Sequence, residues 1–267
     1  MIREAIAAGQ FYPGSSEGLR TMIESMVDDK AEKVDAIGLI SPHAGYIYSG
    51  MVAGAAISKI KLNDTIVMLG PNHTGQGKSF SIMTKGTWIT PLGETEIDSE
   101  LGKRILASSN YLEEDHKAHQ FEHSLEVQVP FLQYFKPDVR IVPIVLAHTQ
   151  GNVYKRIGKE LAAAIKESKK QVTILASSDM THYEPQESAR KKDSKAIEAI
   201  LNLDEDELLR RVADFDISMC GYAPVVSLIS AAKEMGAKKA ELVKYQTSGD
   251  ASGDYRSVVG YAGILLK

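Results

Sequence analysis

The chain has 267 residues, of which 43% are hydrophobic and 25% charged, and its formal net charge is -4. This composition is ordinary for a globular protein, and no basic cluster points to nucleic acid or to an anionic membrane surface as a partner. No apolar run approaches the roughly 20 residues of a transmembrane helix, and the N-terminal residues lack the pattern of a secretory signal. The single cysteine excludes an intrachain disulfide, so we expect a protein of the reducing cytoplasm.

Short apolar runs rich in β-branched residues predict buried strands. They lie at 36–40, 65–69, 139–146 and 172–176, with a further strand at 257–266. Between 79 and 90, β-branched and aromatic residues are mixed with Gly86, which predicts a more exposed hairpin.

Helices are expected between these strands. They are predicted at 17–27, 50–61, 99–108, 153–166, 188–202, 204–214 and 222–235. Alternation of strands and helices predicts an α/β fold, a three-layer sandwich whose central, mostly parallel or mixed β-sheet is flanked by helices. The sequence contains no linker, internal repeat or low-complexity tract, so we expect a single domain over residues 1–267.

Four of the seven histidines directly follow a predicted strand: His43, His73, His148 and His182. In open α/β sheets the ligand crevice lies at the carboxyl ends of the strands. Histidines delivered there by four separate strands predict a shared site. For His148 a structural, hydrogen-bonded role is an equally good interpretation.

The segments around His43 and His73 are alike, Ser-Pro-His-Ala-Gly and Gly-Pro-Asn-His-Thr-Gly. Proline restricts the turn as the chain leaves the strand, and glycine lets the backbone fold back close to a bound group. The pair predicts two rigid loops that present one imidazole each. The alternative is two ordinary turns whose histidines are simply polar.

Three further histidines lie in the segment 115–126. His116 and His119 are interpreted as surface residues of an amphipathic segment. His123 precedes an apolar run, and a helix would place it on the same face as Glu126, three residues later. It is therefore the functional candidate of the three.

Cys220 precedes an expected helix that has Gly221 and Pro224 at its start. A thiol near a helix N-terminus is expected to have a lowered pKa, and the thiolate is the form that binds metals. The alternative is a small buried hydrophobic residue. The strand-end histidines, which need a nearby partner, favour the metal ligand.

The segment from Asn72 to Ser79 nearly matches the phosphate-binding motif G-x-x-x-x-G-K-[ST]. Asn72 replaces the first glycine, and the residues that follow have a strand pattern where the motif needs a helix. We therefore reject nucleotide hydrolysis, although Lys78 could still meet an anionic substrate.

Several of these segments, taken together and in order, resemble the MEMO family, and in particular its prokaryotic "AmmeMemoRadiSam system protein B" group. They are Ala8-Gly-Gln-Phe-Tyr-Pro13, Ser41-Pro-His-Ala-Gly-Tyr-Ile-Tyr-Ser-Gly50, Leu69-Gly-Pro-Asn-His73, Trp88-Ile-Thr-Pro-Leu-Gly93, Glu122-His-Ser-Leu-Glu-Val-Gln-Val-Pro-Phe-Leu132, Ser177-Ser-Asp-Met-Thr-His182 and Cys220-Gly.

The family is similar in fold to class III extradiol ring-cleaving dioxygenases, which hold non-haem Fe(II) with two histidines and a carboxylate. The resemblance implies that His43, His73 and Cys220 are the metal ligands. It implies that His182 is the catalytic base with Asp179 as its orienting partner, and that His123 is a polar residue in the wall of the site.

A thiolate in place of the carboxylate favours Fe, Cu or Zn over Mg or Ca. Our first hypothesis is therefore an oxidoreductase that depends on Fe(II) or copper. The second is a zinc hydrolase with His182 or Glu126 as base. The third is a non-catalytic module that binds a peptide or an anion. The sequence leaves open whether the ligand is a small molecule or a peptide, and whether the chain forms a homo-oligomer.

Overall fold

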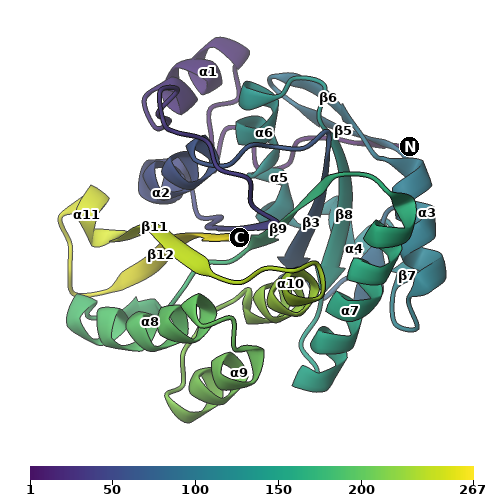
Figure 1. Cartoon of the computed structure of the whole chain (residues 1–267). Coiled ribbons are helices and arrows are strands. Elements are labelled where there is room, and N and C mark those ends of the chain that lie inside the picture. The colour runs from purple at the N-terminus through teal and green to yellow at the C-terminus, as the bar shows by residue number, and fades with distance from the viewer.

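The structure, a computed structural model, describes residues 1–267. Its centre is a nine-stranded mixed sheet with the order β10-β12-β2-β9-β3-β8-β4-β7, and β11 pairs with the other side of β12 (Figure 1). The strands β2, β9, β3 and β8 are parallel, and β12 and β4 add antiparallel strands at the two ends of this parallel core. The predicted α/β sheet is therefore confirmed. The bounds are β2 (Gly38–Ser41), β3 (Thr65–Pro71), β4 (Phe80–Ile82), β7 (Glu113–Glu114), β8 (Arg140–Leu146), β9 (Val172–Ser177), β10 (His182–Glu184), β11 (Ala240–Thr247) and β12 (Val258–Leu266).

A second, three-stranded sheet consists of β1 (Ile2–Arg3), β5 (Thr87–Thr90) and β6 (Gly93–Glu96). The hairpin predicted within 79–90 is wrong, because β4 pairs with β8 in the main sheet while β5 forms its hairpin with β6. Gly86 explains the difference: its φ of 125° is a conformation that favours glycine, and it turns the chain out of one sheet and into the other. The strand β11 was not predicted, since its sequence alternates too weakly between polar and apolar residues.

Helices cover both faces of the main sheet because alternate strand residues point in opposite directions. Ile40 and Val67 belong to one hydrophobic core, and their neighbours Leu39 and Ile66 belong to the other. No helix combines the length and the apolar character that crossing a bilayer requires. The helices on the face of Ile40 and Val67 are α3 (Ser99–Ser108), α7 (Gly151–Ser168), α8 (Gln186–Leu201), α9 (Glu205–Asp214) and α10 (Tyr222–Glu234). Those on the face of Leu39 and Ile66 are α1 (Ser16–Glu24), α2 (Tyr46–Ser58), α5 (His123–Glu126) and α6 (Val129–Phe135). The helices α4 (Lys117–Gln120) and α11 (Gly249–Ser252) are single turns.

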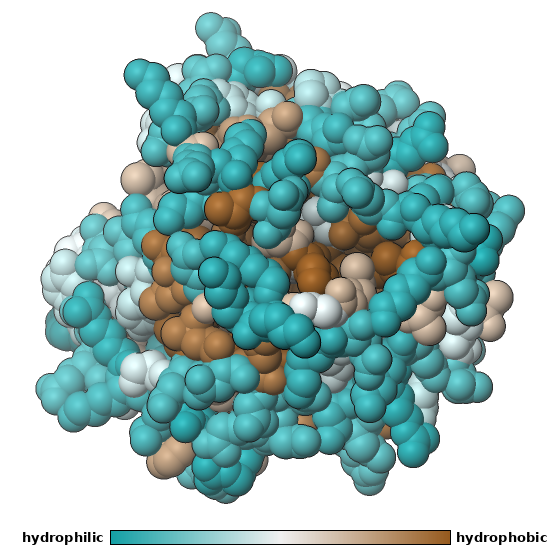
Figure 2. Space-filling view, viewed as in Figure 1, coloured by the Kyte–Doolittle hydropathy of each residue, from teal (hydrophilic) through white to brown (hydrophobic).

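The surface is mostly hydrophilic on the face drawn in Figure 2, with apolar residues gathered in its hollows. A cavity of about 460 Å³ lies between α8 and β11, lined in part by Ile197, Leu201 and Leu242. None of the strand-end histidines lines it.

The helices α7 and α10 pack in contact at Gly158. A Cβ added there would lie 2.3 Å from the carbonyl oxygen of Ser227 and 2.8 Å from Cβ of Ser230. We expect Gly158→Ala to lower the free energy of unfolding by about 1–3 kcal/mol, because one helix must move away from the other. Gly14→Ala is the matched control, since a Cβ there meets its nearest atoms at an ordinary 3.6 Å. Urea unfolding of both variants checks this, and equal stabilities would contradict it.

Candidate metal centre

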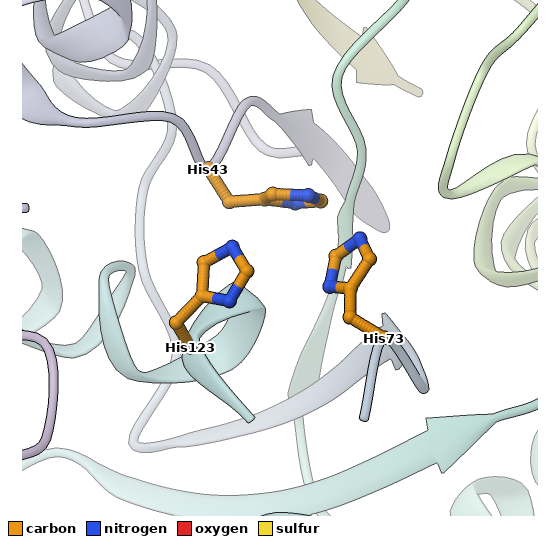
Figure 3. A group of neighbouring side chains, drawn as sticks. All are labelled: His43, His73 and His123. Atoms are coloured by element: carbon orange, nitrogen blue, oxygen red, sulfur yellow. The ribbon is translucent and has the colours of Figure 1, made fainter. Parts of the chain in front are cut away.

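Three imidazoles converge at the carboxyl ends of the parallel strands (Figure 3). His43 lies two residues after β2, His73 two residues after β3, and His123 opens the short helix α5. One ligand nitrogen from each ring lies within 4.8 Å of the other two. The ring centroids of His43 and His73 are 5.2 Å apart, and those of His73 and His123 are 4.9 Å apart. Three imidazoles at these separations could hold one metal ion.

The ring of His43 is held by Ser177, at the end of β9. The Ser177 hydroxyl donates to the carbonyl oxygen of Ser124 (2.7 Å) and accepts from Nε2 of Gln128 (2.9 Å). Its only proton is therefore used, so in the 2.9 Å contact with His43 the ring Nδ1–H must donate. This assigns the lone pair to Nε2 of His43. Burial, followed by the neighbouring His73 and His123, keeps the pKa of His43 well below its usual range, so the ring is neutral near pH 7.

The ring of His73 is held in the same way by Glu122. One carboxylate oxygen lies 2.8 Å from Nδ1 of His73, and the other accepts the backbone N–H of His73 at 2.6 Å. Burial alone would raise the pKa of Glu122, but the hydrogen bond and charge of His73 lower it to about 2. Glu122 is thus a carboxylate and Nδ1–H of His73 is the donor, so in the neutral form of this ring the lone pair lies on Nε2. Carboxylate–histidine pairs of this kind orient metal ligands in many sites.

His123 lies among three aromatic rings. It stacks on His73 with an interplanar angle of 16°, lies edge-on to His43 with ring centroids 5.7 Å apart, and contacts Phe11, with ring centroids 4.5 Å apart. Burial lowers the pKa of His123 as well. The helix α5 can approach β3 because Gly70 lacks a side chain: a Cβ there would lie 2.8 Å from both Leu125 and Ser124.

Cys220 contacts His43 directly. Its Sγ lies 3.2 Å from Nε2 of His43 and accepts the backbone N–H of Asp179 at 3.3 Å. Gly221 allows this approach, because a Cβ there would lie 2.4 Å from the carbonyl oxygen of Ser177. The expected lowering of the thiol pKa is wrong: burial, followed by the charge of Asp179, raises the pKa of Cys220. Loss of solvent around the sulfur outweighs the helix N-terminus.

Asp179 and His182 lie next to this cluster, but they do not pair with each other as expected. Asp179 accepts the backbone N–H of His43 at 2.7 Å, and burial raises the pKa of its carboxyl group. The ring of His182 is oriented by Ser218 instead: its Nδ1 lies 2.9 Å from the carbonyl oxygen of Ser218. A carbonyl only accepts, so Nδ1 of His182 carries the proton and Nε2 is the free nitrogen.

Comparison with known proteins shows the family. Residues 3–265 match the model of the Memo family, described as "Memo-like protein". The chain belongs to this family. It is 46% identical over 268 residues to a MEMO1 family protein of Methanococcoides burtonii, and 42% identical over 281 residues to one of Methanopyrus kandleri. These alignments cover 100% of this chain and 100% and 99% of the relatives.

Among solved structures, the fold is similar to an uncharacterized protein of Escherichia coli K12. The TM-score is 0.57 at 15% sequence identity, over 85% of this chain and 98% of the other. At that identity the similarity concerns the fold alone.

The remaining histidines of this Memo-like chain lie outside the cluster. His148 follows β8, but its exposed ring stacks on Tyr222 and its Nδ1 lies 3.0 Å from the tyrosine hydroxyl. His116 is exposed, as predicted. The prediction that His119 lies on the surface is wrong: it is fully buried, edge-on to Trp88, and neither ring nitrogen has a hydrogen-bond partner.

Glu126 cannot act as a base, because all of its hydrogen-bonding capacity is used. Its two oxygens accept from Arg3 (2.5 Å), the Tyr12 hydroxyl (2.6 Å) and the backbone N–H groups of Ile6 and Ala7. It is fully buried and structural. This removes one of the two bases considered for a hydrolase.

The segment that resembles a phosphate loop leads into β4 rather than into a helix, as its pattern predicted. The side chain of Asn72 accepts from the backbone N–H of Gly75, which closes a turn. Lys78 pairs with Glu113 at 2.8 Å, on the surface.

Sequence reasoning missed the residues that orient two of the candidate ligands. Glu122 and Ser177 hold His73 and His43, and both lie within the segments that carry the family resemblance. A carboxylate directly before a candidate histidine was the available signal for Glu122. Ser177 had none, because only the register of β9 beside β2, which pairs Ser177 with Ser41, brings it to His43.

Proposed function

We propose that this site binds a redox-active divalent metal, Fe(II) or copper, and that the protein is a metal-dependent oxidoreductase. His43 and His73 provide two ligands through Nε2, and Cys220 provides the third. The observation that carries the proposal is the fixed tautomer of both histidines. Each Nδ1–H is committed to a protein acceptor, Ser177 or Glu122, so in the neutral form of each ring the lone pair lies on Nε2.

Cys220 lies at the distance of a neighbouring ligand from His43, whereas the three ligand atoms that the structure brings within 4.8 Å of one another belong to His43, His73 and His123. Bonds of about 2.0 Å to nitrogen and 2.3 Å to sulfur, at angles between 90° and 109°, separate two neighbouring ligands by roughly 3.0–3.5 Å. The distance from Sγ of Cys220 to Nε2 of His43 is 3.2 Å, which also suits a thiol hydrogen bond. Because burial raises the thiol pKa, a bound cation is what would favour the thiolate here. A thiolate beside two imidazoles favours Fe, Cu or Zn.

The other polar residues have roles that their hydrogen bonds define. Asp179 fixes the turn by holding the backbone of His43 and presenting its own N–H to Cys220. His182 has a free Nε2 and can accept a proton from a substrate. His123 lines the site beside His73. The metal, when bound, would supply the electron transfer that these side chains lack.

The experiment is metal analysis of protein produced and purified without oxygen. The wild type is expected to hold about one equivalent of iron or copper, and His43→Ala and Cys220→Ser to hold almost none. His123→Ala should retain the metal if Cys220 is the third ligand, and should lose it if His123 takes that place. His148→Ala is the matched control, since this strand-end histidine lies outside the cluster.

The identity of the metal separates the remaining hypotheses. Iron or copper, followed by oxygen consumption that His182→Gln abolishes, supports the oxidoreductase. Stoichiometric zinc would favour a hydrolase, with His182 as its base because Glu126 is fully occupied. Equal metal content in the wild type and in both ligand variants would overturn the proposed site and leave a binding module.

A further inference from the structure

Arg3 is a buried cation far from the ligands in sequence, and all but one of its side-chain hydrogen bonds go to residues 119–126. Its Nε donates to the carbonyl oxygen of His119 (2.8 Å), its Nη2 to that of Glu122 (2.7 Å), and its Nη1 to the carboxylate of Glu126 (2.5 Å). The remaining bond, at 3.2 Å, goes to the carbonyl oxygen of Glu4. The side chain is 4% exposed.

The segment that Arg3 holds carries two residues of the metal centre. Glu122 orients His73, and His123 stacks on it. The carbonyl oxygen of Glu122 belongs to the peptide group between Glu122 and His123, so Arg3 holds this peptide group by a hydrogen bond. Three donors in a rigid plane fix both the position and the orientation of that turn.

Arg3 is itself held in place by the small sheet. Its backbone pairs with Trp88 through β1 and β5, and its guanidinium lies 4.3 Å from the centroid of the Trp88 ring. Glu126 then ties the segment to residues 6–12 through the N–H groups of Ile6 and Ala7 and the Tyr12 hydroxyl. The adjacent Phe11 packs against His123.

From these contacts we infer that Arg3 is a positioning residue of the metal centre, which holds the turn at residues 119–126 so that Glu122 and His123 meet His73. The inference rests on the proposed metal site for its effect on binding, but the arrangement of the histidines can be measured without any metal.

The test compares Arg3→Met and Arg3→Lys with the wild type. Lysine keeps the charge beside Glu126 but lacks the planar fork, so it separates positioning from charge. Lys170→Met is the matched control, because it also removes a cation from a buried carboxylate, that of Asp98. This pair lies at the amino-terminal ends of β3 and β9, away from the histidines.

The first measurement is the ¹⁵N spectrum of the histidine rings in metal-free protein, which reports the nitrogen that carries the proton. We expect His73 to lose its Nδ1–H signal, or to show it strongly shifted, in both Arg3 variants. His43 should change less than His73, because its partner Ser177 lies on β9 and depends on the segment 119–126 only through the carbonyl oxygen of Ser124. Both rings should be unchanged in Lys170→Met. If the His73 signal is the same in Arg3→Lys as in the wild type, the inference is overturned.

The second measurement is a titration with Co²⁺ followed by its absorption spectrum. We expect both Arg3 variants to bind Co²⁺ on the order of tenfold more weakly than the wild type, with shifted bands, and Lys170→Met to match the wild type. If the wild type does not bind Co²⁺ while the His73 signal still depends on Arg3, the proposed function fails and the positioning role stands. Weakened binding that is equal in Lys170→Met would reduce the role of Arg3 to general stability and overturn the inference.

Discussion

We expect Glu122→Gln to weaken metal binding about 10- to 100-fold, as loss of a carboxylate behind a histidine ligand does in other sites. The two oxygens of Glu122 accept two donors from one residue, the backbone N–H and the Nδ1–H of His73. Glutamine has a single acceptor oxygen, so its NH₂ group must face one of these two donors. When the NH₂ group faces Nδ1, it favours the tautomer with the proton on Nε2, and that ring cannot bind a metal through Nε2.

Isothermal titration with Zn²⁺ or Co²⁺ measures the effect, and Glu160→Gln is its control. Glu160 also accepts several hydrogen bonds, from Ser109 and Asn110, but it lies away from the site. Equal affinity of Glu122→Gln and the wild type would mean that His73 is not a ligand through Nε2.

The second large effect concerns stability in acid and comes from His119. Burial, followed by the charge of Arg3, lowers the pKa of His119 from 6.5 to about 3 in the folded protein. Between these values the unfolded chain binds a proton that the folded chain does not, so the stability falls as the pH falls. The loss begins below about pH 6.5 and reaches about 3 kcal/mol at pH 4.5.

His119→Leu isolates this contribution. Neither ring nitrogen of His119 has a hydrogen-bond partner, so an apolar side chain should cost little stability at pH 7. Urea unfolding at pH 7 and pH 4.5 should show a smaller loss in the variant than in the wild type, by about 3 kcal/mol. Parallel pH dependences in the two proteins would show that His119 is already protonated in the folded state or stays neutral in both states. His116→Leu, at an exposed position, should leave the pH dependence unchanged.

The fold and half of the site could be predicted because they depend on local patterns. A buried strand is a short apolar run, and the residues after parallel strands share one edge of the sheet. This reasoning placed His43 and His73 correctly. It did not distinguish His148, which leaves its strand in the same way, because the direction of a side chain beyond the strand depends on its tertiary neighbours, here Tyr222.

The other half of the site depends on contacts between distant segments. His123 reaches the cluster because Gly70 lets α5 lie against β3, and Glu122 can serve His73 only in that arrangement. The burial of His119 has no local signal either, since histidine at that spacing also suits a surface helix. The pKa of Cys220 is raised rather than lowered for the same reason, because the loss of solvent around the sulfur comes from the tertiary packing and not from the helix that follows.

The two histidines that follow β2 and β3 stand on either side of one strand, since β9 lies between them in the sheet. Hydrogen-bonded strands lie about 4.8 Å apart, so the two supporting backbones are separated by roughly 10 Å whatever side chains they carry. Cys220 and His123, in contrast, stand on a loop and on a single helical turn. Substitutions elsewhere in the chain should therefore leave the spacing of these two backbones unchanged, and adaptation to a different metal or reaction is expected at the positions of Cys220 and His123.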